Sequence, residues 1–132
     1  MQFVSVRVIT HDVARLVDFY VRATGLEARW LAEQFAEVAS PSCTLAIGSA
    51  ETMALFSAGA AVPGSNRTAI LEFLVEDVDR EYERLASLAP EVVQKPTTMP
   101  WGNRSLLFRD PDGNLVNFFT PATGEARARF GR

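Results

Sequence analysis

Few side chains in this sequence have the types and spacing that catalysis needs. The chain has one histidine, His11, and one cysteine, Cys43. A nucleophilic triad needs a histidine as its base, but His11 falls just ahead of an expected helix, where a solvated side chain is the simpler interpretation. A single cysteine excludes an internal disulfide and a multi-cysteine metal site. The loop from Gly59 to Gly64 lacks the Gly-Lys-Ser/Thr ending of a phosphate-binding loop. The residues therefore argue against these familiar kinds of site, and they leave the lining of a cavity as the feature to examine.

The elements that would position such a lining begin with an alternating strand over residues 3–10, which puts its valines on one face. Asp12 then starts a helix with an apolar stripe, which ends at Gly25, a residue suited to a left-handed helix end. The apolar runs that follow are separated by turn-prone residues, and they predict three strands among 26–32, 34–40, 43–48 and 52–57. The first half is expected to be a βαβββ module.

The second half repeats this plan after a linker at about 59–66. Setting residue n beside n+65 matches Asp12-Val13-x-Arg15 to Asp77-Val78-x-Arg80. A strand at 69–75 and a helix from Asp77 are followed by strands at 91–95, 104–109 and 114–120, the last two joined by a type I turn at Asp110-Pro111-Asp112-Gly113. We expect an α+β chain with a single domain at 1–122, made of module 1 at about 1–58 and module 2 at about 67–122. Residues 123–132 are expected to be a frayed tail.

These motifs resemble the vicinal oxygen chelate superfamily, which includes glyoxalase, bleomycin resistance and extradiol dioxygenase proteins. The resemblance covers about the first 120 residues. It rests on Asp12-Val13 with Asp18-Phe19-Tyr20 and Thr24-Gly25-Leu26, on Glu76-Asp77-Val78-Asp79, and on Phe108-Arg109-Asp110-Pro111-Asp112-Gly113-Asn114. It implies two tandem βαβββ modules that form a curved mixed sheet around a cleft, with the helices on the convex face. It also implies a homodimer.

The same resemblance indicates where a metal would be held. Metal-dependent members use four His, Gln or Glu side chains, and the matching positions here are Ser5, about Ala54, Ile70 and Asn117. None of these is a histidine, a glutamate or a thiolate, whereas a divalent ion in a cleft needs several imidazole or carboxylate donors. We therefore expect no metal at these positions and no other cofactor.

The remaining feature is the lining of the cleft. If Leu71, Phe73 and Val75 pack on a helix, the alternate residues face the cleft. An apolar wall with a few polar points is typical of a small-molecule pocket. The expected ligand-binding residues are Arg7, Phe56, Glu72, Trp101, Asn117 and Phe119. Arg7 and Glu72 occupy equivalent positions in the two modules, and we expect them to pair.

Three functions fit these observations. The first is a bleomycin-resistance-like protein that binds a small organic molecule in a metal-free cleft. The second is a metal-independent isomerase or lyase with Glu72 as the base and Arg7 or Asn117 steadying an oxyanion. The third is a dimeric protein with a vestigial cleft. The sequence leaves open whether any reaction is catalysed.

Composition narrows the partners and the location. The chain has 13 Lys and Arg residues against 16 Asp and Glu residues, a net charge of -3, whereas nucleic-acid binding depends on clustered basic residues. It has no apolar run long enough to span a bilayer and no export signal. We therefore expect a cytoplasmic chain with neither a nucleic-acid nor a membrane partner.

Overall fold

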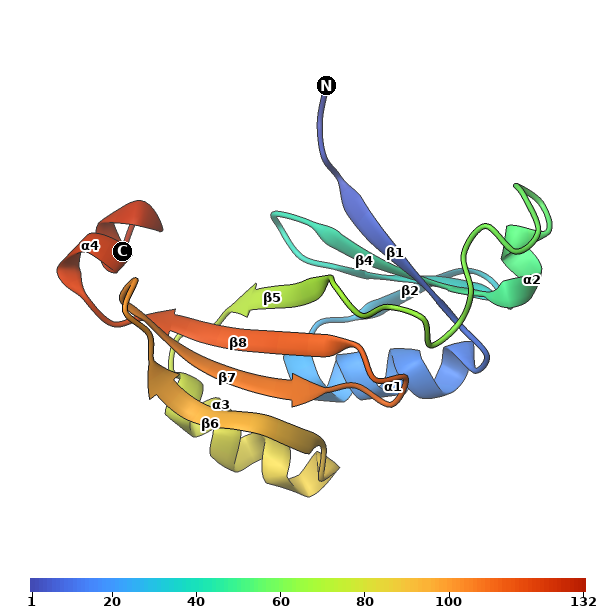
Figure 1. Ribbon diagram of the computed structural model, residues 1–132. Coiled ribbons are helices and arrows are strands. Elements are labelled where there is room, and N and C mark those ends of the chain that lie inside the picture. Colours follow the sequence, from blue (N-terminus) through green and yellow to red (C-terminus); the bar gives the residue numbers. More distant parts are fainter. The chain divides into compact units, whose positions relative to one another are not determined.

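The structure is a computed structural model that describes residues 1–132. It divides into two compact units, Met1–Asn66 and Arg67–Arg132, which we call module 1 and module 2. Each module contains one four-stranded mixed sheet and one longer helix (Figure 1). The predicted α+β fold of two tandem βαβββ modules is confirmed.

Module 1 contains β1 (Ser5–Thr10), α1 (Val13–Thr24), β2 (Ala28–Ala32), β3 (Phe35–Ala39), β4 (Thr44–Ser49) and the short α2 (Ala50–Met53). The strand order is β1-β4-β3-β2, with β1 parallel to β4 and the other pairs antiparallel. Asp12 caps α1 by accepting a hydrogen bond from the Arg15 backbone N–H, and Gly25 ends the helix with a left-handed φ of 73°. Both predicted helix boundaries are confirmed.

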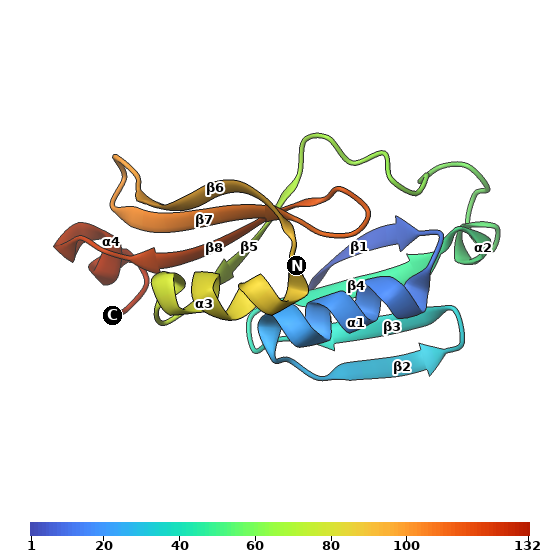
Figure 2. The same cartoon turned by 90° about the horizontal axis from the view of Figure 1, so that it is seen from below.

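The core of module 1 lies between α1 and its sheet. The helix packs on β3 and β4 (Figure 2). Its apolar residues recur at helical spacing, so Leu16 and Tyr20 are fully buried on the same side as Ile47 of β4. The opposite side of the sheet is left free of α1.

Module 2 follows the same order. It contains β5 (Ile70–Leu74), α3 (Val78–Leu85), the 3-10 turn η1 (Ala86–Leu88), β6 (Glu91–Thr98), β7 (Asn103–Arg109), β8 (Leu115–Pro121) and α4 (Gly124–Arg129). The strand order is β5-β8-β7-β6, with β5 parallel to β8. Its core includes Phe108 and Phe118, whose rings meet edge to face with centroids 5.0 Å apart, and α3 packs on β6, β7 and β8.

The predicted turn at Asp110 is present and sets the register between β7 and β8. The Asp110 carboxylate is buried and accepts hydrogen bonds from the backbone N–H groups of Asp112 and Asn114, each at 2.9 Å. Its second oxygen accepts from the Asn114 amide at 2.7 Å, and Gly113 N–H closes the turn on the Asp110 carbonyl. The resulting register places Asn117 beside Leu107 on one side and Glu72 on the other.

Two local expectations are wrong. Residues 52–57 form no strand, because β4 is the last strand of module 1 and passes directly into α2, where Thr52 Oγ1 donates to the Ser49 carbonyl at 2.6 Å. Ala54 is the C-cap of α2 and lies off the sheet. The C-terminal tail is not frayed throughout either, since Thr123 caps α4 by accepting from Ala126 N–H. No helix of the chain is long and apolar enough to cross a membrane.

Candidate functional site

Each sheet has one face that α1 or α3 does not cover, which we call the open face of that module. In module 2, Leu71 is 9% exposed and belongs to the core, so the alternation of β5 turns its neighbours Ile70 and Glu72 the other way. The strand registers place the remaining members on the same faces. The open face of module 1 includes Ser5, Arg7, Phe35, Glu37, Ala46 and Gly48; that of module 2 includes Ile70, Glu72, Ser105, Leu107, Asn117 and Phe119.

The open face of module 1 carries an arginine stacked on aromatic rings. The Arg7 guanidinium carbon lies over the Phe35 ring at 4.3 Å from its centroid and over the Phe56 ring at 5.3 Å. Within module 1 the guanidinium makes no hydrogen bond and no ion pair, and Arg7 is exposed. The ring faces hold the cation while its N–H edges stay available.

Phe56 reaches Arg7 from an unexpected position. It lies in the turn after α2 rather than on a strand, and it is 69% exposed. Its backbone N–H donates to the Met53 carbonyl at 3.1 Å, which continues the helical turn to this residue. That Phe56 lines a ligand-binding surface stays a prediction, whereas the expected strand at 52–57 is wrong, because the residue follows α2.

The open face of module 2 carries a hydrogen-bonded pair, Glu72 and Asn117. These residues are register partners on β5 and β8, and the Asn117 amide Nδ2 donates to the Glu72 carboxylate at 2.8 Å. Asn117 is only 8% exposed, and its Oδ1 is buried without a hydrogen-bond partner. A buried acceptor left unpaired costs about 1–3 kcal/mol. A donor that reached this oxygen would therefore be stabilised there.

Phe119 continues the open face of module 2 two residues beyond Asn117. It is 7% exposed, and its ring centroid lies 5.2 Å from that of Phe130, which follows α4. The C-terminal segment thus contributes an aromatic wall that sequence reasoning missed. The available signal was Thr123 ahead of a short run with helix-forming alanines, followed by a single aromatic residue.

The structure brings the predicted residues together in two groups. Arg7 joins Phe56 in module 1, whereas Glu72, Asn117 and Phe119 share one face in module 2. Trp101 lies in the turn between β6 and β7 and is 60% exposed. The pairing of Arg7 with Glu72 stays a prediction.

The residues at the metal-matching positions do not fit a divalent ion. Ser5 and Ile70 lie on β1 and β5, and neither they nor Asn117 offers an imidazole, a carboxylate or a thiolate. Ala54 lies off the sheet. On β4, Ala46 pairs with Arg7 in the way that Asn117 pairs with Glu72 on β8. The Ala46 side chain has no atom that could bind a metal. No group of three or more His, Cys, Asp or Glu side chains is placed to hold an ion.

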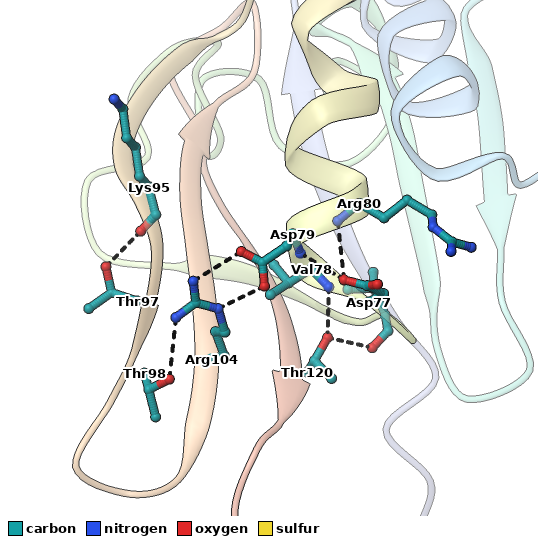
Figure 3. A network of polar contacts seen from close by, with 10 residues as sticks. Asp77, Val78, Asp79, Arg80, Lys95, Thr97, Thr98, Arg104 and Thr120 are labelled. Carbon is teal, nitrogen blue, oxygen red and sulfur yellow. Dashed lines mark hydrogen bonds and ion pairs between the residues drawn. The ribbon is translucent and has the colours of Figure 1, made fainter.

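A second polar cluster lies at the start of α3 (Figure 3). Arg104 of β7 donates to both carboxylate oxygens of Asp79, at 2.8 and 3.0 Å. These hydrogen bonds hold the pKa of the Asp79 carboxyl below its usual value, against a smaller opposing effect of desolvation. Thr120 of β8 accepts from the Val78 N–H at 2.9 Å and donates to the Val75 carbonyl at 3.0 Å. These contacts tie α3 to its sheet, which is a structural role.

Known proteins match this chain along nearly its whole length. The family model for the Glyoxalase/Bleomycin resistance protein/Dioxygenase superfamily matches residues 2–118. The uncharacterized protein YraH of Bacillus subtilis (strain 168) is 30% identical over 125 residues, which are 90% of this chain and 98% of that protein.

Solved structures show the same likeness. A glyoxalase/bleomycin resistance protein/dioxygenase from Nocardioides is 26% identical, with a TM-score of 0.76 over 94% of this chain and 85% of that one. A family enzyme from Burkholderia phytofirmans PsJN, at 15% identity, shares the fold, with a TM-score of 0.82 over 92% of this chain and 99% of that one.

Proposed function

This chain belongs to the Glyoxalase/Bleomycin resistance protein/Dioxygenase superfamily, and we propose that it binds a small organic molecule on the open face of module 2 without a metal. The observation that carries the proposal is the buried, unpartnered Oδ1 of Asn117 beside the Glu72 carboxylate. Buried polar atoms in folded proteins nearly always have a partner, and of the four side-chain atoms that lack one here, this oxygen is the one beside the Glu72 carboxylate.

The chemistry of the faces supports a small organic ligand. Ile70 and Phe119 are the apolar neighbours of Glu72 and Asn117 on the same face, and Ile70 is 47% exposed. The amide oxygen accepts a hydrogen bond, and the free lone pairs of the carboxylate accept others. A ligand with an apolar body and an N–H or O–H donor matches both features.

A metal-independent isomerase or lyase is the second candidate. The observation that favours it is the hydrogen bond from Asn117 to Glu72, because a general base needs a neighbouring group that orients it. The two candidates differ in what Glu72 does. Replacing Glu72 by glutamine keeps the shape and removes the basicity, so in an enzyme it abolishes turnover while the ligand still binds.

Binding is tested by a thermal-shift screen of small aromatic, cationic and dicarbonyl compounds, because a ligand that binds only the native state raises the melting temperature. The hits are then titrated against Asn117→Leu, which keeps the volume and removes the acceptor. We expect this variant to weaken binding by about tenfold or more, as the loss of one buried hydrogen bond requires.

Gln34→Leu is the matched control, since it makes the same amide-to-leucine change at an exposed residue of module 1, in the turn between β2 and β3. Its affinity should equal that of the wild type. A screen without any hit would favour a vestigial cleft, and a ligand that binds Asn117→Leu as tightly as the wild type would show that the site is elsewhere. We also propose that the chain works in the cytoplasm as a homodimer, which sedimentation equilibrium of the purified chain would show as twice its mass.

A further inference from the structure

We infer that the open face of module 1 binds an anion, specifically a small aromatic carboxylate, and that Arg7 binds the charged group of that anion. This inference goes beyond the proposed function, because it adds a site in module 1 to the one proposed at Asn117 in module 2. The observation behind it is that Arg7 presents a stacked guanidinium whose N–H donors make no hydrogen bond or ion pair within module 1.

The charge of Arg7 is not neutralised by the residues of its own sheet. The strand registers set Arg7, Ala46, Glu37 and Arg29 in one row across the open face of module 1. Arg29 lies directly opposite Glu37, whereas Ala46 separates Glu37 from Arg7, and opposed residues on adjacent strands interact most strongly. Glu37, the single carboxylate of the row, therefore lies closer to Arg29 than to Arg7. Arg7 is left as the surplus positive charge.

The two rings make Arg7 a prepared anion-binding group rather than a mobile surface cation. Contact with the Phe35 and Phe56 rings restricts the rotamers of Arg7, which lowers the entropy lost when a ligand binds. The in-plane N–H groups stay free, and two of them match the two oxygens of a carboxylate. Planar carboxylates therefore fit this group better than spherical ions.

The surroundings of Arg7 indicate the rest of the ligand. The neighbouring β4 residues, Ala46 and Gly48, are buried, and the space over Gly48 is filled by Thr52 and Phe35. Phe56, by contrast, is 69% exposed, so its ring offers an apolar surface beside the guanidinium. A flat aromatic body therefore fits against this ring, next to the charged group.

The test compares naphthoate with its neutral amide, naphthamide, by isothermal titration calorimetry. The two probes have nearly the same shape and differ in charge. We expect wild-type protein to bind naphthoate at least about tenfold more tightly than naphthamide, because a charge-assisted bidentate pair is stronger than a neutral hydrogen bond. This preference should shrink at high salt.

Three variants assign the preference to Arg7. Arg7→Met keeps a long side chain without charge and should remove the preference. Arg7→Lys keeps the charge without the planar fork and should retain only part of it. Arg15→Met removes a positive charge from α1, on the covered side of the module 1 sheet, and should leave the preference as in wild type. The melting temperature of each variant shows whether it is folded.

The outcomes separate the inference from the proposed function. Equal affinity of the wild type for the two probes, or a preference that survives in Arg7→Met, overturns the inference and leaves the proposed function standing. A preference lost equally in Arg15→Met also overturns it, because a general positive field would then explain the selectivity. If neither probe and no neutral or cationic compound binds, the proposed function fails and the inference fails with it.

Discussion

Replacing Gly102 by alanine should detach the C-terminal helix α4 from module 2. Gly102 has a φ of +95°, in the region that favours glycine. A β-carbon there would overlap Thr123 Oγ1 and would lie 3.0 Å from the β-carbon of Ala126. Thr123 cannot move away freely, because its hydroxyl caps α4 and its backbone N–H donates to the Gly102 carbonyl at 3.2 Å. The added methyl group therefore acts on the cap itself.

The magnitude follows from what would be lost. An L-residue with a left-handed φ costs about 1–2 kcal/mol, and a lost N-cap costs about 1 kcal/mol. Separating Phe130 from Phe119 adds about 1 kcal/mol for the ring contact. We expect the free energy of unfolding, measured by urea titration, to fall by about 3 kcal/mol, a large part of the 5–15 kcal/mol typical of a domain.

Gly64→Ala is the matched control, because Gly64 also has a positive φ, +70°, but a β-carbon there meets nothing within 4 Å. It should cost only the backbone strain of about 1–2 kcal/mol. Trypsin should cleave after Arg127 faster in Gly102→Ala than in Gly64→Ala. Equal losses of stability and equal cleavage rates in the two variants would refute the packing of α4 on Gly102.

Three further predictions concern the turn, the start of α3 and metal content. Asp110→Ala removes the acceptor of two backbone N–H groups and should lower the free energy of unfolding by about 2–3 kcal/mol in a urea titration; unchanged stability would contradict the role of that carboxylate. Arg104 lowers the folded-state pKa of Asp79. This pair therefore stabilises the fold at pH values above 3.8, the ordinary pKa of the carboxyl, and its contribution is lost as pH falls through the lowered pKa. The stability difference between wild type and Asp79→Asn should be constant near neutral pH and vanish in acid, and a difference that grows in acid would reverse the assigned sign. Elemental analysis of protein purified without chelator should find far less than one equivalent of Ni, Zn, Fe or Mn per chain, and stoichiometric metal that disappears in Asn117→Leu would contradict the argument from the donor set.

The features that sequence predicted well depend on contacts between near neighbours. The Asp12 cap acts on a residue three positions away, and the Asp110 carboxylate acts within four positions. Such signals need no knowledge of the rest of the fold. The helix starts and the hairpin turn could therefore be inferred from the sequence alone.

The features that sequence predicted badly depend on insertions and distant contacts. Residues 52–57 contain Met53, Leu55 and Phe56, a short apolar run that fits a strand or a helical turn equally well. The two modules also differ in length between their first and last strands, so Ala46 and Asn117 are 71 residues apart although Arg7 and Glu72 are 65 apart. Two contacts join residues from different elements: Phe130 packs on Phe119, and Phe56 contacts Arg7. No local sequence pattern predicts either contact.

The distribution of strand pairing has a consequence for how the chain can be cut. Every strand pair joins strands of the same module, and none spans the segment from Ser57 to Asn66. A protease nick after Pro63 would therefore break no ladder, and each fragment would keep a complete sheet with its long helix. Fragments of this size sit near the lower limit at which a single hydrophobic core is stable. The two halves should thus be separable as polypeptides yet marginal as folded proteins, so that co-expression of both fragments becomes a natural way to label one half at a time.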